Sequence, residues 1–306
     1  MLRGLWSGAS RSTIIHVVTN LAGAGKRARR AHEETHILTY KLGIAGLGAI
    51  GMKVAGKIDS GAIPGIALAA VTANDKTRAA EKVAGFAAPP TVCTLAELSD
   101  HADIVFECAP ASVFAEVAGP AVEKGRMFMP LSVGALLNHM DLVDRARETG
   151  ARIIVPTGAI IGLDTVRAMA VGEITSVRLE TRKPPNGLAG APYLVENDID
   201  VDNLSEALCV FRGSAREAAR AFPANVNVAA ALGLAGVGPD KTTIEVWADP
   251  AMDRNQQTVT IESDTGEATM QIRNVPSAEN PRTGKIVANS VLATLDRLTA
   301  PLVAGT

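Results

Sequence analysis

The chain has 306 residues, of which 47% are hydrophobic and 20% charged, so a disordered chain that cannot bury a core is excluded and about two domains are expected. A net charge of −2 gives no general attraction to nucleic acid, and no apolar run of about 18 residues predicts a membrane span. We therefore expect neither a nucleic-acid nor a membrane partner. Three scattered cysteines, without metal-ligand spacing, favour a reducing, cytoplasmic setting and no metal site.

The N-terminal segment differs in charge from the rest of the chain. Residues 1–41 contain seven Lys or Arg residues and two Glu residues, a formal charge of +5, which leaves −7 on the remainder. Residues 1–40 show no clear order of strands and helices, so we expect a disordered leader there. Its serines and arginines leave a targeting segment open as the alternative.

A glycine-rich turn separates the first predicted strand from the first predicted helix. The apolar strand at 41–45 runs into the sequence GLGAIG at 46–51, and residues 52–59 have helical character. Strand, G-x-G-x-x-G and helix in this order are typical of a dinucleotide-binding fold. We therefore expect NAD or NADP as the cofactor.

Each glycine of this turn has a predicted physical role. Gly46 allows the tight turn, Gly48 lets the backbone approach a pyrophosphate, and Gly51 lets the helix pack closely on the strand. The helix N-terminus then offers backbone N–H groups to the phosphates. This places Ala49 and Ile50 among the predicted cofactor-binding residues.

Strands and helices continue to alternate as far as residue 156. Further strands are predicted at 66–72, 104–109, 126–132 and 152–156, and helices at 76–84, 94–99, 111–124 and 141–149. Such alternation predicts an α/β fold with a Rossmann-type, doubly wound parallel sheet.

The end of the second predicted strand bears on the choice between NAD and NADP. A site selective for NAD normally carries Asp or Glu there, about 20 residues after the glycines, to hold the ribose 2′-hydroxyl. Here Asn74 occupies that place, with Lys76 and Arg78 close behind. Without the carboxylate a 2′-phosphate is not repelled, and these cations could attract it. We hypothesise that NADP is accepted; the alternative is that the cations are solvated helix charges.

Loops after the first-domain strands should line the nicotinamide half of the site. They begin at Cys108, Ser132 and Pro156 and are rich in small residues. We predict that Ala109 contacts the cofactor. Cys108 has no histidine beside it in a nucleophile motif, so we interpret it as a buried structural thiol.

Beyond residue 165 the pattern changes to short strands with a hairpin signal. Strands are predicted at 176–182, 207–211, 243–248, 258–263 and 268–274, and helices at 214–221, 226–234 and 283–298. They predict a second, smaller α+β domain with a mixed sheet over residues 165–280. We expect the last helix to return to the dinucleotide-binding domain, which then comprises residues 41–164 and 281–306.

Seven segments carry a resemblance to a known family. They are TGAIIGLD at 157–164, TRKPP at 181–185, FRGSAREAA at 211–219, FPANVNVA at 222–229, LAG at 234–236, ADP at 248–250 and NPRTG at 280–284. In this order they resemble the L-aspartate dehydrogenase family. The resemblance implies a Rossmann domain with a substrate domain, usually as a homodimer. It also implies reversible oxidative deamination of L-aspartate to oxaloacetate through iminosuccinate.

The same resemblance implies two residues near the nicotinamide. Ala159 and Asn227 match family positions that contact the cofactor there. The alternatives are that Ala159 only fits a tight turn and that Asn227 only caps the helix that begins beside it.

One family position departs from the pattern. The family's catalytic histidine follows the Asp-Pro segment by a few residues, and Gln257 stands in its place. Glutamine can orient a substrate but cannot exchange a proton near neutral pH, as histidine does. The five histidines lie at 16, 32, 36, 101 and 139, so the second domain holds none. We therefore keep Gln257 as a catalytic-site residue with altered chemistry.

Other cations are candidates for the missing chemistry. Lys241 could act as a general base if burial lowers its pKa, and Arg282 and Lys285 could hold a substrate carboxylate. Each of them could equally be a solvated surface charge.

Three functions remain open at this point. The first is an NAD(P)-dependent dehydrogenase acting on the CH–NH₂ group of aspartate. The second is a dehydrogenase or imine reductase for another small amino or oxo acid, because the catalytic histidine is absent. The third is a weakly catalytic NAD(P)-binding protein. The glycine turn predicts cofactor binding in all three, so only activity distinguishes them.

Overall fold

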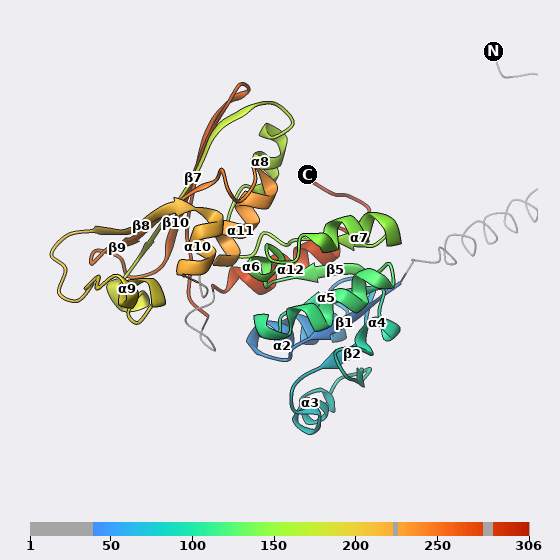
Figure 1. Ribbon diagram of the computed structural model, residues 1–306. Helices are drawn as coiled ribbons and strands as arrows, with labels where there is room; N and C mark the ends of the chain where they lie inside the picture. Colours follow the sequence, from blue (N-terminus) through green and yellow to red (C-terminus); the bar gives the residue numbers. More distant parts are fainter. Residues whose placement is uncertain (1–38, 223–225, 278–283, 306) are drawn as a thin grey trace, which may run out of the picture. The chain divides into compact units, whose positions relative to one another are not determined.

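The computed structural model describes residues 39–222, 226–277 and 284–305 (Figure 1). The leader predicted over residues 1–40 lies outside them except for Thr39 and Tyr40, and Tyr40 already begins the first strand. Within the described residues the strands form two sheets, one of six strands and one of five.

The first sheet is wholly parallel and has the strand order β3-β2-β1-β4-β5-β6. Its strands are β1 (Tyr40–Ala45), β2 (Ile66–Thr72), β3 (Thr91–Val92), β4 (Ile104–Glu107), β5 (Met127–Pro130) and β6 (Arg152–Ile153). This is the order of a Rossmann fold. Successive strands are added on one side of β1 as far as β3, and from β4 on they are added on its other side. The predicted doubly wound sheet is confirmed.

Helices pack on the first sheet through apolar residues. They are α2 (Ala49–Asp59), α3 (Lys76–Val83), α4 (Leu98–His101), the short 3₁₀ helix η1 (Ala111–Val113), α5 (Phe114–Glu123), α6 (Val133–Leu136), α7 (Asp141–Thr149) and, from the end of the chain, α12 (Ile286–Asp296). Val291 and Leu295 of α12 share one buried cluster with Val54 and Ile58 of α2. The expected return of the last helix to this part of the fold is therefore observed.

The helix predicted at 94–99 was wrong in its bounds. Thr94 donates through its backbone N–H and its hydroxyl to the Glu97 carboxylate, at 2.9 and 2.7 Å. The backbone N–H of Glu97 donates back to the Thr94 hydroxyl at 3.3 Å. This closed turn satisfies the local polar groups without a helix, and the helix begins only at Leu98.

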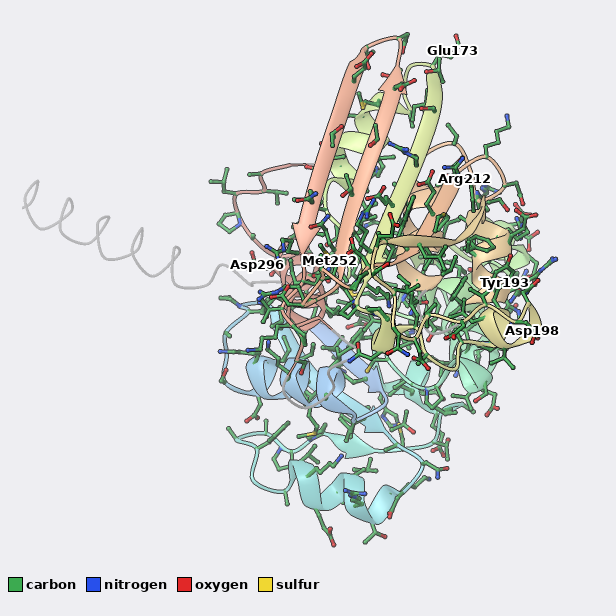
Figure 2. The ribbon with its side chains drawn as sticks, turned by 90° about the vertical axis from the view of Figure 1, so that its left-hand side faces the viewer. Glu173, Tyr193, Asp198, Arg212, Met252 and Asp296 are labelled. Atoms are coloured by element: carbon green, nitrogen blue, oxygen red, sulfur yellow. The ribbon has the colours of Figure 1, made fainter. Side chains whose placement is uncertain are left out.

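The second sheet is mixed and has the order β11-β10-β7-β9-β8, as Figure 2 shows for its long strands. Its strands are β7 (Ile174–Lys183), β8 (Leu208–Ser214), β9 (Thr243–Ala248), β10 (Gln256–Ser263) and β11 (Gly266–Arg273). Only β7 and β9 pair in parallel. The associated helices are α8 (Leu163–Met169), the 3₁₀ helix η2 (Pro185–Gly187), α9 (Pro192–Glu196), α10 (Ala215–Ala221) and α11 (Val226–Ala235). The predicted mixed sheet is confirmed.

One face of β7 is buried, and the alternation of side chains along this strand determines which residues lie on it. In β7 the buried positions are Val177, Leu179, Thr181 and Lys183. The apolar members join a cluster with residues of α10 and α11, including Leu232. Because side chains alternate strictly along a strand, the polar Thr181 and Lys183 lie on the same face as the core.

The glycine turn brings α2 very close to β1. Gly46 has φ +103°, and a Cβ atom there would lie 2.7 Å from the Cys108 carbonyl oxygen. A Cβ atom at Gly51 would lie 2.0 Å from the Gly46 carbonyl oxygen. Neither position can hold a side chain without movement of backbone.

Glu107 joins the loops that follow β4 and β5. It is fully buried, and its carboxylate accepts from the backbone N–H and the hydroxyl of Ser132, at 3.0 and 2.9 Å. Burial raises the pKa of Glu107 above its ordinary value, although the hydrogen bonds from Ser132 oppose the shift. This buried pair fixes the loop ends that face the cofactor side of the sheet.

Two glycines of α2 provide a matched test of the close approach. Gly51→Ala should destabilise the fold by roughly 1–3 kcal/mol, because its Cβ overlaps backbone. Gly56→Ala in the same helix has nothing within 4 Å of the new Cβ, so it should stabilise by roughly 0.5–1 kcal/mol. Urea unfolding of the two variants measures both changes. Equal changes in the free energy of unfolding for the two variants would show that the short distance between α2 and the Gly46 carbonyl does not constrain position 51.

Replacement of Glu107 should reveal both its hydrogen bonds and its raised pKa. Glu107→Ala should cost about 1–3 kcal/mol for each donor of Ser132 left buried without an acceptor. The folded-state pKa lies above the unfolded value, so the stability contributed by Glu107 is greatest below the unfolded pKa and declines as pH rises through the folded pKa. The difference in free energy of unfolding between Glu107→Ala and the natural chain should therefore become smaller from about pH 4 to about pH 8, as measured by urea titrations.

The exposed Glu97 supplies the control for that experiment. Hydrogen bonds from Thr94 lower the pKa of Glu97, so the stability that it contributes is present above the unfolded pKa and lost as pH falls. The destabilisation caused by Glu97→Ala should accordingly stay constant above about pH 6 and shrink as the pH falls toward about 4. The same trend for both variants would contradict the assignment of a raised pKa to Glu107.

Candidate active site

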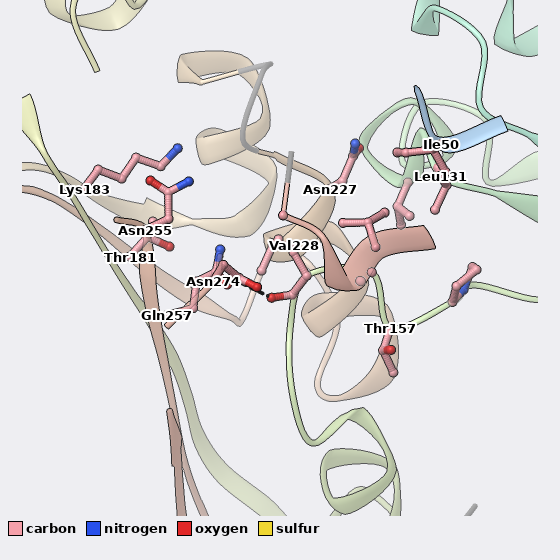
Figure 3. A pocket seen from close by; sticks show the side chains of 17 residues that line it. Ile50, Leu131, Thr157, Thr181, Lys183, Asn227, Val228, Asn255, Gln257 and Asn274 are labelled. Atoms are coloured by element: carbon pink, nitrogen blue, oxygen red, sulfur yellow. Dashed lines mark hydrogen bonds between the residues drawn. The ribbon is translucent and has the colours of Figure 1, made fainter. Parts of the chain in front are cut away.

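A pocket of about 180 Å³ adjoins the glycine turn (Figure 3). Ile50 of α2 and Thr157 after β6 line it from the first sheet's side. Thr181 of β7 and Gln257 of β10 line it from the second sheet. The pocket therefore collects residues from segments far apart in the sequence.

The glycine turn passes a physical test for a dinucleotide site. A Cβ atom on Gly48 would meet nothing within 4 Å, so the space in front of the turn is open to a ligand. Gly48 is also the N-cap residue of α2, an 11-residue helix whose first turn presents backbone N–H groups. Ala49 and Ile50 belong to that first turn. A pyrophosphate fits such a helix start in both charge and hydrogen bonding.

Two other predicted cofactor residues lie at the end of β2. Asn74 and Lys76 are exposed, with Lys76 as the first residue of α3. Between them Asp75 caps α3, and its side chain accepts from the backbone N–H of Arg78 at 2.9 Å. The nearest acid is therefore used as a helix cap.

Of the three residues predicted near the nicotinamide, two line the pocket and one does not. Ala159 and Asn227 both line the pocket, together with Ile50. Ala109 does not line it but follows β4, with its backbone N 3.0 Å from where a Gly46 Cβ would stand. Asn227 accepts through Oδ1 from the backbone N–H of Gly134 in α6, at 3.0 Å. Asn227 thus links α11 to α6, and this oxygen does not cap α11.

Gln257 lies in a buried chain of amide hydrogen bonds. Asn274 donates through Nδ2 to the Ala159 carbonyl oxygen at 3.0 Å and to Gln257 Oε1 at 2.7 Å. Gln257 and Asn274 are 7% and 6% exposed. Since Oε1 is used, the amide Nε2 is the donor that Gln257 can offer to a ligand. Within the described residues, Asn274 Oδ1 is buried without a hydrogen-bond partner.

Lys183 is the residue of this pocket that sequence reasoning missed. It ends β7, is only 6% exposed, and lines the cavity with Thr181. Burial of the ammonium group lowers the pKa of Lys183 to about 8. Its place on the core-facing side follows from alternation with Val177 and Leu179, a signal already present in the sequence.

Of the other predicted cations, Lys241 and Lys285 are not among the described residues that line the pocket. Lys241 is exposed in the turn between α11 and β9, where Thr242 hydrogen-bonds to Gly238 through its N–H and hydroxyl. The burial that a general base required is absent there, so we correct that prediction. Lys285 is exposed at the N-cap of α12, although Gly284 beside it does line the pocket. Arg282 lies outside the described residues.

Cys108, predicted as a buried thiol, is half-buried in the structure. Its thiol donates to the Gly46 carbonyl oxygen at 3.1 Å. Burial raises its pKa well above the ordinary value, so it remains a protonated thiol. Cys108 therefore packs and hydrogen-bonds beneath the glycine turn.

Metal and membrane sites do not appear in the described part of the chain. No three His, Cys, Asp or Glu side chains there are grouped as metal ligands. None of its helices is long and apolar enough to cross a membrane.

Comparison with known families divides the chain at the place where the sheets change. Residues 46–156 match the family described as "Homoserine dehydrogenase, NAD binding domain". Residues 164–298 match the family described as "Aspartate dehydrogenase, C-terminal". A region that matches an NAD-binding family is therefore followed by a region that matches the C-terminal part of aspartate dehydrogenases.

Similar proteins extend over nearly the whole described chain. An L-aspartate dehydrogenase of Bradyrhizobium diazoefficiens is 49% identical over 274 residues, which cover 90% of this chain and 97% of that protein. L-aspartate dehydrogenase 3 of Bordetella bronchiseptica is 48% identical, over 86% of this chain and 96% of that protein. The crystal structure of an aspartate dehydrogenase from Thermotoga maritima superposes with a TM-score of 0.68 at 26% identity, covering 87% of this chain and 99% of that one. This chain belongs to the L-aspartate dehydrogenase family.

Proposed function

We propose that this chain is an NAD(P)-dependent L-aspartate dehydrogenase that interconverts L-aspartate and oxaloacetate through iminosuccinate. The observation that carries the proposal is the small pocket beside the start of α2, where one lysine, threonines and amides lie among apolar side chains, in a chain 49% identical to a named L-aspartate dehydrogenase. The pocket supports a small, polar substrate placed next to a dinucleotide. It favours this function over a dehydrogenase for a bulky substrate.

The cofactor would be held along the carboxyl ends of the first sheet. Gly46, Gly48 and Gly51 leave room for the pyrophosphate, and the first turn of α2 offers it N–H groups. Ala159 and Asn227 would flank the nicotinamide, which when bound accepts a hydride from the substrate. We retain Ala109, Asn74, Lys76, Ala49 and Ile50 as proposed contacts along the same path.

We also propose that NADP is accepted. Asp75 lies three residues past the end of β2, and its Oδ1 accepts from the backbone N–H of Arg78 as the cap of α3. Asn74, which is exposed, carries no charge to repel a 2′-phosphate, and Lys76 supplies a nearby cation. The family resemblance leads us to propose further a homodimer that works in the cytoplasm.

Gln257 would orient the substrate. Its Oε1 is held by Asn274, which itself is fixed on the Ala159 carbonyl, so the position of Nε2 is set before substrate binds. A preorganised amide donor suits a carboxylate or a carbonyl oxygen. Lys285 and Arg282 remain proposed contacts for the outer end of the substrate.

Steady-state assays test the function and the cofactor choice together. L-aspartate with NADP⁺ or NAD⁺ should give at least tenfold higher kcat/KM than other amino acids, and NADPH should support reduction of oxaloacetate with ammonia. A hundredfold preference for NADH would contradict NADP acceptance. Faster turnover of another oxo acid or cyclic imine would favour the second function, and micromolar cofactor binding without any turnover would favour the third.

Gln257→Leu tests the orienting role. Loss of the donor should raise KM for L-aspartate about tenfold, equal to about 1.4 kcal/mol, with the Kd for NADPH unchanged within twofold. Gln271→Leu is the matched control, because Gln271 is exposed on β11 and hydrogen-bonds to Thr258. An unchanged KM in Gln257→Leu would contradict the role.

A further inference from the structure

We propose that Lys183 accepts the proton of the substrate ammonium group, an inference that rests on the dehydrogenase function proposed above. The reaction needs such a group. An amino acid binds mainly as its ammonium form near neutral pH, and its nitrogen has no lone pair until one proton leaves. The pocket must therefore provide a base before the carbon–hydrogen bond can be oxidised.

The proton step balances with Lys183 alone. The lone pair on Lys183 Nζ forms a new N–H bond while one N–H bond of the substrate ammonium breaks. The electron pair of the broken bond stays on the substrate nitrogen. It then forms the C=N bond as the Cα hydrogen leaves with its two electrons to the oxidised cofactor. The products are an iminium group and a lysine ammonium, so one proton and one hydride have left the substrate.

Geometry places Lys183 in the proposed reaction pocket. Thr181 lies opposite Gln257 in the register of β7 and β10, and Lys183 follows two residues later on the same face of β7. Figure 3 shows Lys183 with Thr181 and Gln257 on one side of the view and Asn227 on the other. All four residues line one cavity.

Lys183 is the only ionisable side chain among the described residues that line the pocket. The remaining polar liners are the threonines Thr157 and Thr181 and the amides Asn227, Asn255, Gln257 and Asn274. Hydroxyl and amide groups do not exchange protons at useful rates near neutral pH. Any proton acceptor supplied by these residues must therefore be Lys183.

Charged groups on the opposite face of β7 pair with one another. Arg182 occupies the opposite face of β7 and pairs with Glu180 and Asp249, at 2.7 and 3.0 Å. Asp249, which follows β9, also accepts from the backbone N–H of Ala251 at 2.9 Å. The sides formed by β10 and α11 contribute amides and apolar groups. Burial is accordingly the cause of the lowered pKa, at about 8, of Lys183.

A lysine of this kind suits proton transfer better than permanent charge pairing. With a pKa near 8, both the neutral and the charged form are populated in the working range, so the amine can accept a proton and return it. An arginine would bind a carboxylate at every pH but could not do this. The two roles can thus be separated by substitution.

Three variants provide the kinetic test. Lys183→Met should lower kcat for L-aspartate oxidation by about 10²–10⁴, while NADPH binding stays within twofold. Lys183→Arg should show the same loss, because it keeps the charge without a titratable amine. Small primary amines should restore part of the rate of Lys183→Met. Lys57→Met, at an exposed position in the last turn of α2, should keep the natural rate.

Proton transfer also predicts a pH signature. The kcat for oxidation should rise with pH to a plateau above about pH 8, because the neutral amine is the active form. This limb should disappear in Lys183→Met. If Lys183→Arg retains the natural kcat and pH profile, Lys183 holds a carboxylate and the proposal is overturned.

A measurement without substrate separates this proposal from the proposed function. Acetic anhydride labelling of the natural chain, read by mass spectrometry across pH, should give Lys183 a reactivity midpoint near 8. A midpoint above 10 would overturn the proposal whatever the enzyme oxidises. Aspartate turnover that persists unchanged in Lys183→Met would overturn it too, while leaving the aspartate dehydrogenase function intact.

Discussion

The contact between α2 and the strand before it is the constraint on which the site depends. Gly51 can have no side chain because the Gly46 carbonyl oxygen occupies the position of its Cβ. This contact fixes where α2 starts, and so where its N–H groups face and where Ile50 enters the pocket. A larger residue would shift the helix and move the phosphate cradle and one side of the pocket together. The start of α2 and one side of the pocket therefore both depend on one backbone contact.

The second sheet contributes buried polar side chains to the pocket, and their burial is unfavourable unless they are hydrogen-bonded. Register between β7 and β10 sets Thr181 opposite Gln257 on the buried face, where polar atoms need partners. Asn274 meets that need for Gln257 and also reaches the Ala159 carbonyl in the loop after β6. The same amide therefore links β10 of the second sheet to the loop after β6 of the first.

Sequence patterns predicted the elements with strong local signals. The helix at Asp141–Thr149 and the strand at Thr243–Ala248 have the expected bounds. Lys241 was predicted as the base from a loop, and its exposure in the structure makes that prediction wrong. The phase of alternation along β7 places Lys183 inside, but that signal acquires a function only when the pairing with β10 is known. Asn274 likewise gains its role from contacts 17 and 115 residues away in the chain.

An amide at position 257 and a titrating lysine at position 183 are physically compatible in a way that two charged groups would not be. Gln257 carries no charge at any working pH, so it adds no electrostatic shift to the lowering of the pKa of Lys183 by burial. A carboxylate at position 257 would favour the lysine ammonium and raise that pKa, and a protonated histidine would lower it further. The neutral amide therefore keeps the lysine near the pH at which it can both take and release a proton. The residue that cannot transfer protons thereby sets the conditions under which its neighbour can.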